Sequence, residues 1–370
     1  MKKRYLAPQI QHDLQKKMVF VGGPRQVGKT TLAKTFLKNR DGYLNWDVAV
    51  HRELILTYEL PNTPLWVFDE LHKYRRWRNY LKGIYDNKSE KQKILVTGSA
   101  RLDYYRYSGD SLQGRYHYLR LHPLSFAELK LKTEADFLDL MKLGGFPEPY
   151  FSAKEIEAKR WSREYRTRLI REDMTQLERI QDLGSMELLA MRLPELVGSP
   201  LSINALREDL QVSHKAVSTW IKVLERLYAV FRIAPFGASK IRAVKKEQKH
   251  YHYDWTLIKN DGVRFENVVA CALQKWVHYQ QDVFAEEMEL RYFRDIDGRE
   301  VDFVVMKDEK PVQFIECKWN DTPVSDALRY LKERFPSCDA WQISAVGKKD
   351  YISTNNIRVC PATVFLQRLI

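Results

Sequence analysis

The chain has 370 residues, of which 44% are hydrophobic, and a net charge of +13. This length accommodates two or three domains, each with its own core. No apolar run approaches the roughly 20 residues that span a membrane, and the basic N-terminus lacks the apolar segment of a secretory signal. The four scattered cysteines have neither metal-ligand spacing nor the pattern of a disulfide framework, so we expect a cytoplasmic protein without membrane partners.

The positive charge is unevenly distributed along the chain. Basic residues outnumber acidic ones up to residue 260, and acidic residues slightly outnumber basic ones from residue 261 onwards. Basic charge favours a nucleic-acid partner. Part of the excess can instead neutralise a bound triphosphate, and a basic run such as 73–78 also suits a solvated helix face. The charge therefore permits DNA binding without requiring it.

A glycine-rich loop lies between a predicted strand at 18–21 and a predicted helix at 30–38. It consists of Gly23, Pro24, Arg25, Gln26, Val27, Gly28, Lys29 and Thr30, with Thr31 next. In this setting the backbone N–H groups and the helix N-terminus surround an anion. We expect Lys29 to reach the β- and γ-phosphates and the Thr30 hydroxyl to bind Mg²⁺. The pattern predicts a nucleoside-triphosphate site.

A second predicted strand, 65–68, ends in Asp69 and Glu70. At the tip of a strand beside the loop, Asp69 can hold the Mg²⁺ shell and Glu70 can act as the base that activates water. The alternative is two solvated acids that begin a helix.

A third strand is predicted at 94–99. If it lies between the first two, Thr97 and Ser99 at its polar end are candidates to sense the γ-phosphate or to orient water, although small hydroxyl residues also end ordinary strands. Strands at 43–47 and 116–121 complete a parallel sheet covered by helices, the α/β fold class.

Several segments resemble a family of bacterial and archaeal AAA-type ATPases. They are the runs 23–32, 67–73, 97–100, 114–115 and 123–128. In that family the ATPase is followed by a domain of unknown function with a nuclease-like end. The resemblance implies a prokaryotic cytoplasmic protein driven by ATP, and adenine as the base rests on the resemblance alone. It also makes Arg115 a candidate arginine for the γ-phosphate, in its own chain or from a neighbouring subunit, and Arg171 is another.

The segment 151–260 predicts a charged helix at 155–173 and then a helix-turn-helix. Residues 203–210 and 214–227 have helical apolar spacing around a short turn, with Ser213 as an N-cap. A wing is expected over 232–253. The residues that could contact DNA are His214, Lys215, Ser218, Thr219 and Lys222 on the second helix, and Lys240, Arg242, Lys245, Lys246 and Lys249 on the wing. A winged helix used only for protein contacts is the alternative.

The last segment, 261–370, carries a second chemical pattern. Strands at 300–306 and 312–318 form a predicted hairpin that brings Asp302 opposite Glu316 and Lys318. Two carboxylates inside apolar strands are costly unless paired, and Mg²⁺ between them would remove that cost. The arrangement resembles the PD-(D/E)xK nucleases, and Glu266 fits the acidic helix position that adds a metal ligand. The alternatives are a surface ion pair and a fold that has lost its activity.

Three domains are therefore expected: a P-loop AAA-type ATPase domain at 1–150, a helical connector with a winged-helix module at 151–260, and a PD-(D/E)xK nuclease-like domain at 261–370. The expected function is ATP hydrolysis coupled to DNA binding or to Mg²⁺-dependent DNA cleavage. The alternative is a nucleotide-dependent regulatory switch whose last domain is inactive and binds a partner. Self-association into a ring is a weaker third hypothesis.

Overall fold

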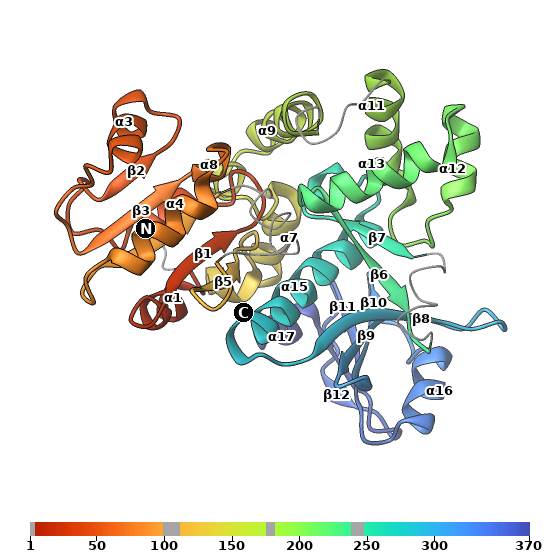
Figure 1. Cartoon of the computed structure of the whole chain (residues 1–370). Helices are drawn as coiled ribbons and strands as arrows, with labels where there is room; N and C mark the ends of the chain where they lie inside the picture. Colours follow the sequence, from red (N-terminus) through yellow and green to blue (C-terminus); the bar gives the residue numbers. More distant parts are fainter. Residues whose placement is uncertain (1–3, 99–111, 175–181, 238–247) are drawn as a thin grey trace. The chain divides into compact units, whose positions relative to one another are not determined.

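The computed structural model describes residues 4–98, 112–174, 182–237 and 248–370 (Figure 1). They form two compact units. The first comprises Met1–Pro123 and Arg226–Tyr228, and the second comprises Leu124–Glu225 and Ala229–Ile370. This division differs from the expected three segments, because the strands that follow the helix-turn-helix and the strands of the last segment share one sheet. Both expected boundaries, after 150 and after 260, fall inside the second unit.

The first unit contains a five-stranded parallel sheet. Its strands are β1 (Met18–Gly22), β2 (Tyr43–Asn45), β3 (Leu65–Asp69), β4 (Lys93–Thr97) and β5 (Tyr116–Arg120), in the order β2-β3-β4-β1-β5. All five expected strands are present, and β4 lies between β3 and β1, the condition under which Thr97 and Ser99 were candidates for the γ-phosphate. Apolar runs such as β1 form strands that are buried on both faces, which is typical of parallel sheets.

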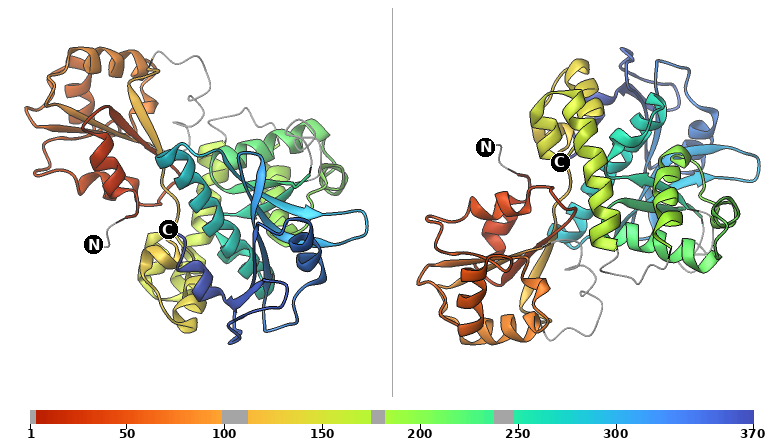
Figure 2. Two further views of the ribbon diagram at one scale, coloured as in Figure 1. Left: turned by 90° about the horizontal axis from the view of Figure 1, so that it is seen from below. Right: turned by 90° about the horizontal axis from the view of Figure 1, so that it is seen from above.

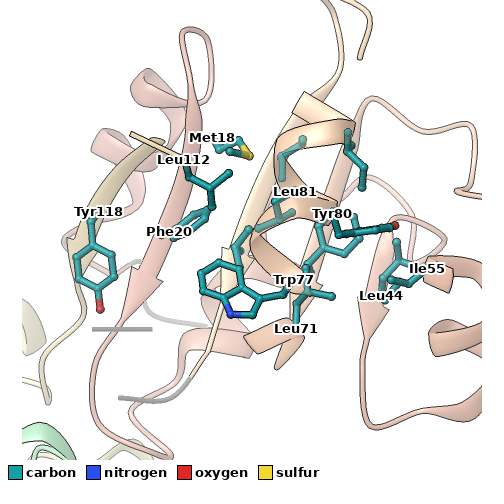
Figure 3. Close-up of a cluster of buried hydrophobic side chains, with 14 residues drawn as sticks. Met18, Phe20, Leu44, Ile55, Leu71, Trp77, Tyr80, Leu81, Leu112 and Tyr118 are labelled. Carbon is teal, nitrogen blue, oxygen red and sulfur yellow. The ribbon is translucent and has the colours of Figure 1, made fainter. Parts of the chain in front are cut away.

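Helices complete the first unit. They are α1 (Ala7–Asp13), α2 (Lys29–Lys34), α3 (Ala49–Thr57) and α4 (Trp77–Asn87), with a short 3-10 turn at Leu71–Lys73. Helix α2 ends four residues before the expected Lys38. Figure 3 shows Trp77 and Leu81 of α4 in the same cluster of buried apolar side chains as Phe20 of β1. This cluster fixes the sheet whose carboxyl edge carries the phosphate loop.

The second unit contains an eight-stranded mixed sheet in the order β12-β13-β11-β10-β9-β8-β6-β7. The strands are β6 (Val230–Pro235), β7 (Lys249–His252), β8 (Met288–Arg294), β9 (Glu300–Lys307), β10 (Lys310–Lys318), β11 (Asp339–Ser344), β12 (Tyr351–Ile352) and β13 (Arg358–Pro361). The predicted hairpin is confirmed: β9 and β10 are antiparallel, and their turn uses Asp308 and Glu309 with positive φ.

The other described helices follow along the chain. They are α6 (Phe126–Leu129), α7 (Glu134–Leu143), α8 (Pro147–Ser152), α9 (Glu155–Arg168), α11 (Leu183–Arg192), α12 (Ile203–Leu210), α13 (His214–Arg226), α15 (Asp261–Phe284), α16 (Asp326–Arg334) and α17 (Ala362–Leu366), with a π-helical turn at Leu169–Met174 and 3-10 turns at Leu193–Leu196 and Trp255–Leu257. Helix α15 packs against β7, β8 and β10, and both views in Figure 2 show it beside the sheet.

The predicted helix-turn-helix is present as α12 and α13. The hydroxyl oxygens of Ser202 and Ser213 accept N-capping hydrogen bonds from the N–H groups of Ala205 and Ala216. The expected wing is only partly recovered, because β6 and β7 pair as a hairpin but β7 is fully buried. Four of the five basic residues expected on the wing, Lys240 to Lys246, lie outside the described residues.

All four cysteines are free thiols. In the described part of the chain, no helix combines the length and the apolar character needed to cross a membrane.

Candidate functional sites

The loop at 23–30 joins the end of β1 to the start of α2. Gly23 and Gly28 have φ of +133° and +97°, in the region that side chains disfavour. A Cβ atom on Gly23 would stand 2.2 Å from the carbonyl oxygen of Leu121, so only glycine fits there. Gln26 also has a positive φ, of +60°. The conformation of the predicted phosphate loop is thus imposed by its glycines and by the neighbouring strand.

Lys29 lies at the first position of α2 with a buried side chain. Its amino group donates hydrogen bonds to the carbonyl oxygens of Gly23 at 3.0 Å and Pro24 at 2.6 Å. The ammonium therefore lies against the loop, at the position from which a P-loop lysine contacts phosphate.

The carboxylate of Asp69 is the centre of the site. It accepts hydrogen bonds from the hydroxyl groups of Thr30 at 2.7 Å, Thr97 at 2.6 Å and Tyr43 at 2.7 Å. The structure thus brings Thr30, Asp69 and Thr97 together, as the sequence predicted. A carboxylate and a threonine hydroxyl are oxygen ligands of the kind that Mg²⁺ prefers, so these residues fit that ion.

Sequence reasoning missed Tyr43. Its side chain is brought to Asp69 by the parallel pairing of β2 with β3, in which Asn45 is opposite Asp69. Burial, and then the neighbouring Asp69 carboxylate, raise the pKa of Tyr43, so its hydroxyl stays a donor. The motif contains no signal for this residue, because strand pairing alone decides which side chain stands beside Asp69.

Glu70 directly follows β3 and has a φ of +57°. Such a conformation in a residue other than glycine costs of order 1–3 kcal/mol and is typical of functional sites. The N–H of Glu70 donates to the carbonyl oxygen of Thr97 at 3.0 Å. Burial raises the pKa of Glu70, while Lys73 at 3.4 Å lowers it in part. A partly buried carboxylate with a raised pKa is the kind of group that accepts a proton from water.

The structure does not bring Arg115 to this site. Arg115 precedes β5, and its carbonyl oxygen accepts from the N–H of Met18, where β1 begins. It is therefore at the amino edge of the sheet, whereas the phosphate loop follows the carboxyl end of β1. Its guanidinium pairs with the carboxylate of Asp86 at 2.8 Å. The expected contact with a γ-phosphate of its own domain does not fit this geometry, and Ser99 lies outside the described residues.

A cavity of about 710 Å³ lies elsewhere in the first unit. Its lining includes Gln11 and Leu14 of α1 and its neighbouring turn, and Leu65 and Lys93 at the amino ends of β3 and β4. These strand ends are at the edge of the sheet opposite to the phosphate loop.

The second site lies on β9, β10 and α15 of the second unit. Asp302 on β9 accepts a hydrogen bond from the N–H of Cys317 at 2.8 Å, and the amino group of Lys318 lies 2.7 Å from a carboxylate oxygen of Glu316. Glu266 lies on α15 and accepts from the hydroxyl of Tyr251 at 2.7 Å. The residues predicted for this site are thus placed on neighbouring elements in the expected order.

An unexpected cation lies among these acids. The amino group of Lys249 is 2.5 Å from a carboxylate oxygen of Glu300, 3.5 Å from Glu266 and 4.0 Å from Asp302. Its side chain is only 1% exposed. The prediction that Lys249 lies along an exposed wing is therefore wrong. The pairing of β7 with β6 carries it into the sheet.

The electrostatics of this second site follow from burial. Burial, and then the Asp302 carboxylate, raise the pKa of Glu266 to about 7 and that of Glu316 to about 8. Burial lowers the pKa of Lys249, but its carboxylate neighbours outweigh this effect and raise the pKa overall. Within the described ranges, no three His, Cys, Asp or Glu residues are arranged to hold a metal ion.

Comparisons with known proteins divide the chain into three parts. Residues 15–130 match the family described as an AAA domain, residues 134–260 a domain of unknown function (DUF8612), and residues 261–365 another domain of unknown function (DUF4143). The first match covers the parallel sheet and the phosphate loop. Residues 15–130 are therefore an AAA-type ATPase-like domain. The division at 260/261 coincides with an expected domain boundary.

Two curated relatives match most of the chain. They are the uncharacterized proteins Mb2031c of Mycobacterium bovis and Rv2008c of Mycobacterium tuberculosis, each 23% identical over 325 residues, covering 84% of this chain and 73% of the relative.

Among solved structures, a variant of Thermotoga maritima RuvB is 18% identical, with a TM-score of 0.30, over 61% of this chain and 88% of that chain. Bacteroides Pif1 bound to ssDNA is 15% identical, with a TM-score of 0.23, over 38% of this chain and 45% of that chain. At such low TM-scores, neither similarity bears on the function of this chain.

Proposed function

We propose that this chain binds Mg²⁺ and ATP at the loop 23–30 and hydrolyses ATP to ADP and phosphate. The observation that carries the proposal is the triple hydrogen bonding of the Asp69 carboxylate by Thr30, Thr97 and Tyr43. It places a carboxylate and a hydroxyl, the two protein ligands that Mg²⁺ takes in P-loop ATPases, within one hydrogen bond of each other.

Each residue of the site has a defined part in this reaction. The loop N–H groups and the Lys29 ammonium bind the phosphates. Thr30 and Asp69 hold the metal, which when bound neutralises charge on the phosphate oxygens. Glu70 accepts the proton of the attacking water, and its raised pKa suits it to that transfer. Thr97 and Tyr43 orient the Asp69 carboxylate.

The test separates binding from hydrolysis. In Glu70→Gln we expect a fluorescent ATP analogue to bind as in the wild type, while phosphate release falls by about 10²-fold or more, since a general base contributes that much. Lys29→Ala should lose both. The control is Glu59→Gln, which alters an exposed acid of the same unit. Hydrolysis by Glu70→Gln at the wild-type rate would contradict the role of Glu70.

We further propose that ATP hydrolysis is coupled to DNA binding through α13. His214, Lys215 and Lys222 are exposed on this helix, and Ser218 and Thr219 are half-buried beside them. Basic and hydroxyl side chains on the second helix of such a motif contact phosphates and base edges.

The DNA proposal is tested by fluorescence anisotropy with labelled duplex DNA, with and without ATP. The double variant Lys215→Ala, Lys222→Ala should bind more weakly, and the slope of log affinity against log salt should shrink by roughly two if both lysines neutralise phosphates. Lys348→Ala, Lys349→Ala removes the same charge elsewhere in the unit and should bind as the wild type. Equal loss in both double variants would indicate a merely general charge effect.

A second candidate function is a nucleotide-dependent switch whose last segment binds a partner without cleaving DNA. The position of Lys249 among Glu266, Glu300 and Asp302 favours it, because a lysine already neutralises the acids. A cleavage assay would distinguish this switch from a nuclease. Supercoiled and single-stranded DNA are incubated with Mg²⁺ or Mn²⁺, with and without ATP. Cleavage that is lost in Asp302→Ala supports a nuclease, and its dependence on Lys29 would show whether ATP gates it. Intact ATP turnover without cleavage supports the switch.

If hydrolysis needs an arginine, we propose that a second copy of the chain supplies it, since Arg115 pairs with Asp86 at the other edge of its own sheet. Gel filtration with and without an ATP analogue tests self-association, and a monomer under all conditions would contradict it.

A further inference from the structure

The cavity of about 710 Å³ in the first unit is lined by residues of α1, of α2 and the turn after it, and of the amino ends of β3 and β4. Pockets of roughly 300–1,000 Å³ are the size that encloses small organic ligands. Much of the lining is apolar: it includes the buried Leu14, Leu32 and Leu65 and the half-buried Phe36 and Leu37. Such a lining favours a ligand with an apolar body.

The same cavity carries positive charge. Arg4, Lys38 and Lys93 line it, and the described part of its lining contains no aspartate or glutamate. The side chains of Lys38 and Lys93 have no hydrogen-bond or ion-pair partner among the described residues, although Lys93 is half-buried. One acid lies beside the lining, since Asn39 donates to the carboxylate of Asp41 at 2.7 Å. The ends of α1 and α2 add at most about half a negative charge each, so the two lysines leave a positive excess.

The backbone holds the guanidinium of Arg4 in a fixed position. It donates hydrogen bonds to the carbonyl oxygens of Val27 at 2.6 Å and His122 at 2.5 Å. Carbonyl oxygens orient a guanidinium without cancelling its net charge. A cation that the fold has already oriented loses little conformational entropy when an anion binds.

We propose that this cavity binds a small organic anion that carries an apolar ring or chain. The apolar part contacts Phe36 and the leucines, and the carboxylate, sulfonate or phosphate lies beside Lys38 and Lys93. A neutral ligand would leave both lysines without a counter-charge, and an inorganic anion would leave the apolar lining uncovered. The proposal concerns the amino edge of the sheet and does not rest on ATP binding or hydrolysis.

Two fluorescent probes with the same ring system test the two halves of this proposal on the full-length chain. Anilinonaphthalene sulfonate is the anionic probe, and phenylnaphthylamine is the neutral probe that lacks the sulfonate. We expect the anionic probe to bind roughly tenfold more tightly, as two partly exposed ion pairs would provide. Octanoate should displace it and octylammonium should not. Equal affinity for the two probes, or displacement by octylammonium, would overturn the assignment of an anion.

Variants of the lining separate charge from apolar contact. The double variant Lys38→Gln, Lys93→Gln should weaken the anionic probe by roughly tenfold and leave the neutral probe unchanged, because only the sulfonate loses its partners. Phe36→Ser should weaken both probes. The control Lys82→Gln, Lys91→Gln removes the same charge from exposed lysines of the same unit that do not line the cavity. It should bind both probes as the wild type does.

Three outcomes with these variants would overturn the proposal. The first is an equal loss of the anionic probe in both double variants, which would reflect overall charge. The second is wild-type binding of the anionic probe by Lys38→Gln, Lys93→Gln, and the third is wild-type binding of both probes by Phe36→Ser. If thermal unfolding shows that these variants are not folded, Gln11→Glu takes their place. Gln11 is exposed on α1 and lines the cavity, so the new carboxylate should weaken the anionic probe alone, and unchanged binding would count against the site.

ATP must be tested separately, because Arg4 lines the cavity and also contacts Val27 of the phosphate loop. A non-hydrolysable ATP analogue with Mg²⁺ should leave the anionic probe bound. Lys29→Ala should bind the probe as the wild type does, whatever becomes of its nucleotide binding. Competitive displacement of the probe by the analogue would show that the cavity belongs to the nucleotide site, and would overturn the proposal. Absence of ATP binding would contradict the proposed function and leave the probe results unaffected.

Discussion

The hydroxyl of Thr30 donates a hydrogen bond of 2.7 Å to the carboxylate of Asp69, which follows it by 39 positions in the chain. This bond joins the first turn of α2 to the end of β3. Thr97 and Tyr43 donate to the same carboxylate, so two strands besides β3 hold it in place. A carboxylate fixed by three donors is oriented before any metal binds, which lowers the cost of forming the site.

Tyr43→Phe tests that orientation. A hydrogen bond to a charged group contributes about 1.5–3 kcal/mol, so we expect the Mg²⁺ concentration for half-maximal ATP turnover to rise by roughly tenfold or more. Turnover at saturating Mg²⁺ should stay close to that of the wild type, because Tyr43 contacts the ligand and not the phosphates. Tyr58→Phe removes an exposed hydroxyl from the same unit and is the control. An unchanged Mg²⁺ requirement in Tyr43→Phe would show that Tyr43 does not orient the Asp69 carboxylate for Mg²⁺ binding.

Gly23→Ala tests the conformation of the phosphate loop. The new Cβ would stand 2.2 Å from the carbonyl oxygen of Leu121, at a φ of +133° that alanine avoids. We expect loss of nucleotide binding, measured with a fluorescent ATP analogue. Gly83→Ala is the matched control. It lies in α4, where an added Cβ would meet no atom within 4 Å, and should leave binding unchanged or raise stability slightly. Wild-type binding by Gly23→Ala would mean that the loop rearranges freely.

A buried histidine makes stability depend on pH. Burial lowers the pKa of His250 to about 4, and its Nε2 lies 2.9 Å from the carbonyl oxygen of Leu193. The folded chain thus keeps this histidine neutral, while the unfolded chain takes up a proton below about pH 6.5. The free energy of unfolding should therefore fall as the pH drops from about 6.5 to about 4, by up to about 1.4 kcal/mol per pH unit.

The measurement is urea unfolding of the wild type and of His250→Gln between about pH 6.5 and about pH 4. Gln can donate to the same carbonyl oxygen but does not titrate, so the stability difference between the two should narrow as the pH falls. His214→Gln, on the exposed surface of α13, is the control. A difference that stays constant with pH would contradict the assignment to His250.

The phosphate loop and the hairpin that carries Asp302 and Glu316 could be predicted because their patterns are local. The glycine spacing of 23–30 and the strand alternation of 312–318 act over a few residues, and β9 and β10 are joined by a short turn. The position of β4 between β3 and β1 could not be predicted, because apolar runs with polar ends do not determine the order of strands in a sheet.

Some strand pairings were not predictable in this way. Arg115 has the right chemistry, but it precedes a strand of the parallel sheet and so lies at its amino edge. The wing and the last segment were expected to be separate, yet β6 pairs in parallel with β8 through Ala234 and Arg291. Such pairing depends on which strand edges lie side by side in the folded chain, and the sequence of neither strand contains a signal for it.

The sequence by itself determined which functional groups are present: a loop that can surround phosphate, an Asp-Glu pair after a buried strand, and a set of acids in the last segment. Only the tertiary structure decided which charges meet. The pairing of β2 with β3 brings Tyr43 to Asp69, and the sheet that contains β7 and β9 brings Lys249 to Glu266, Glu300 and Asp302. These contacts are important because the charges are buried. A charged group removed from water is costly unless an opposite charge or a hydrogen-bond partner lies beside it in the fold.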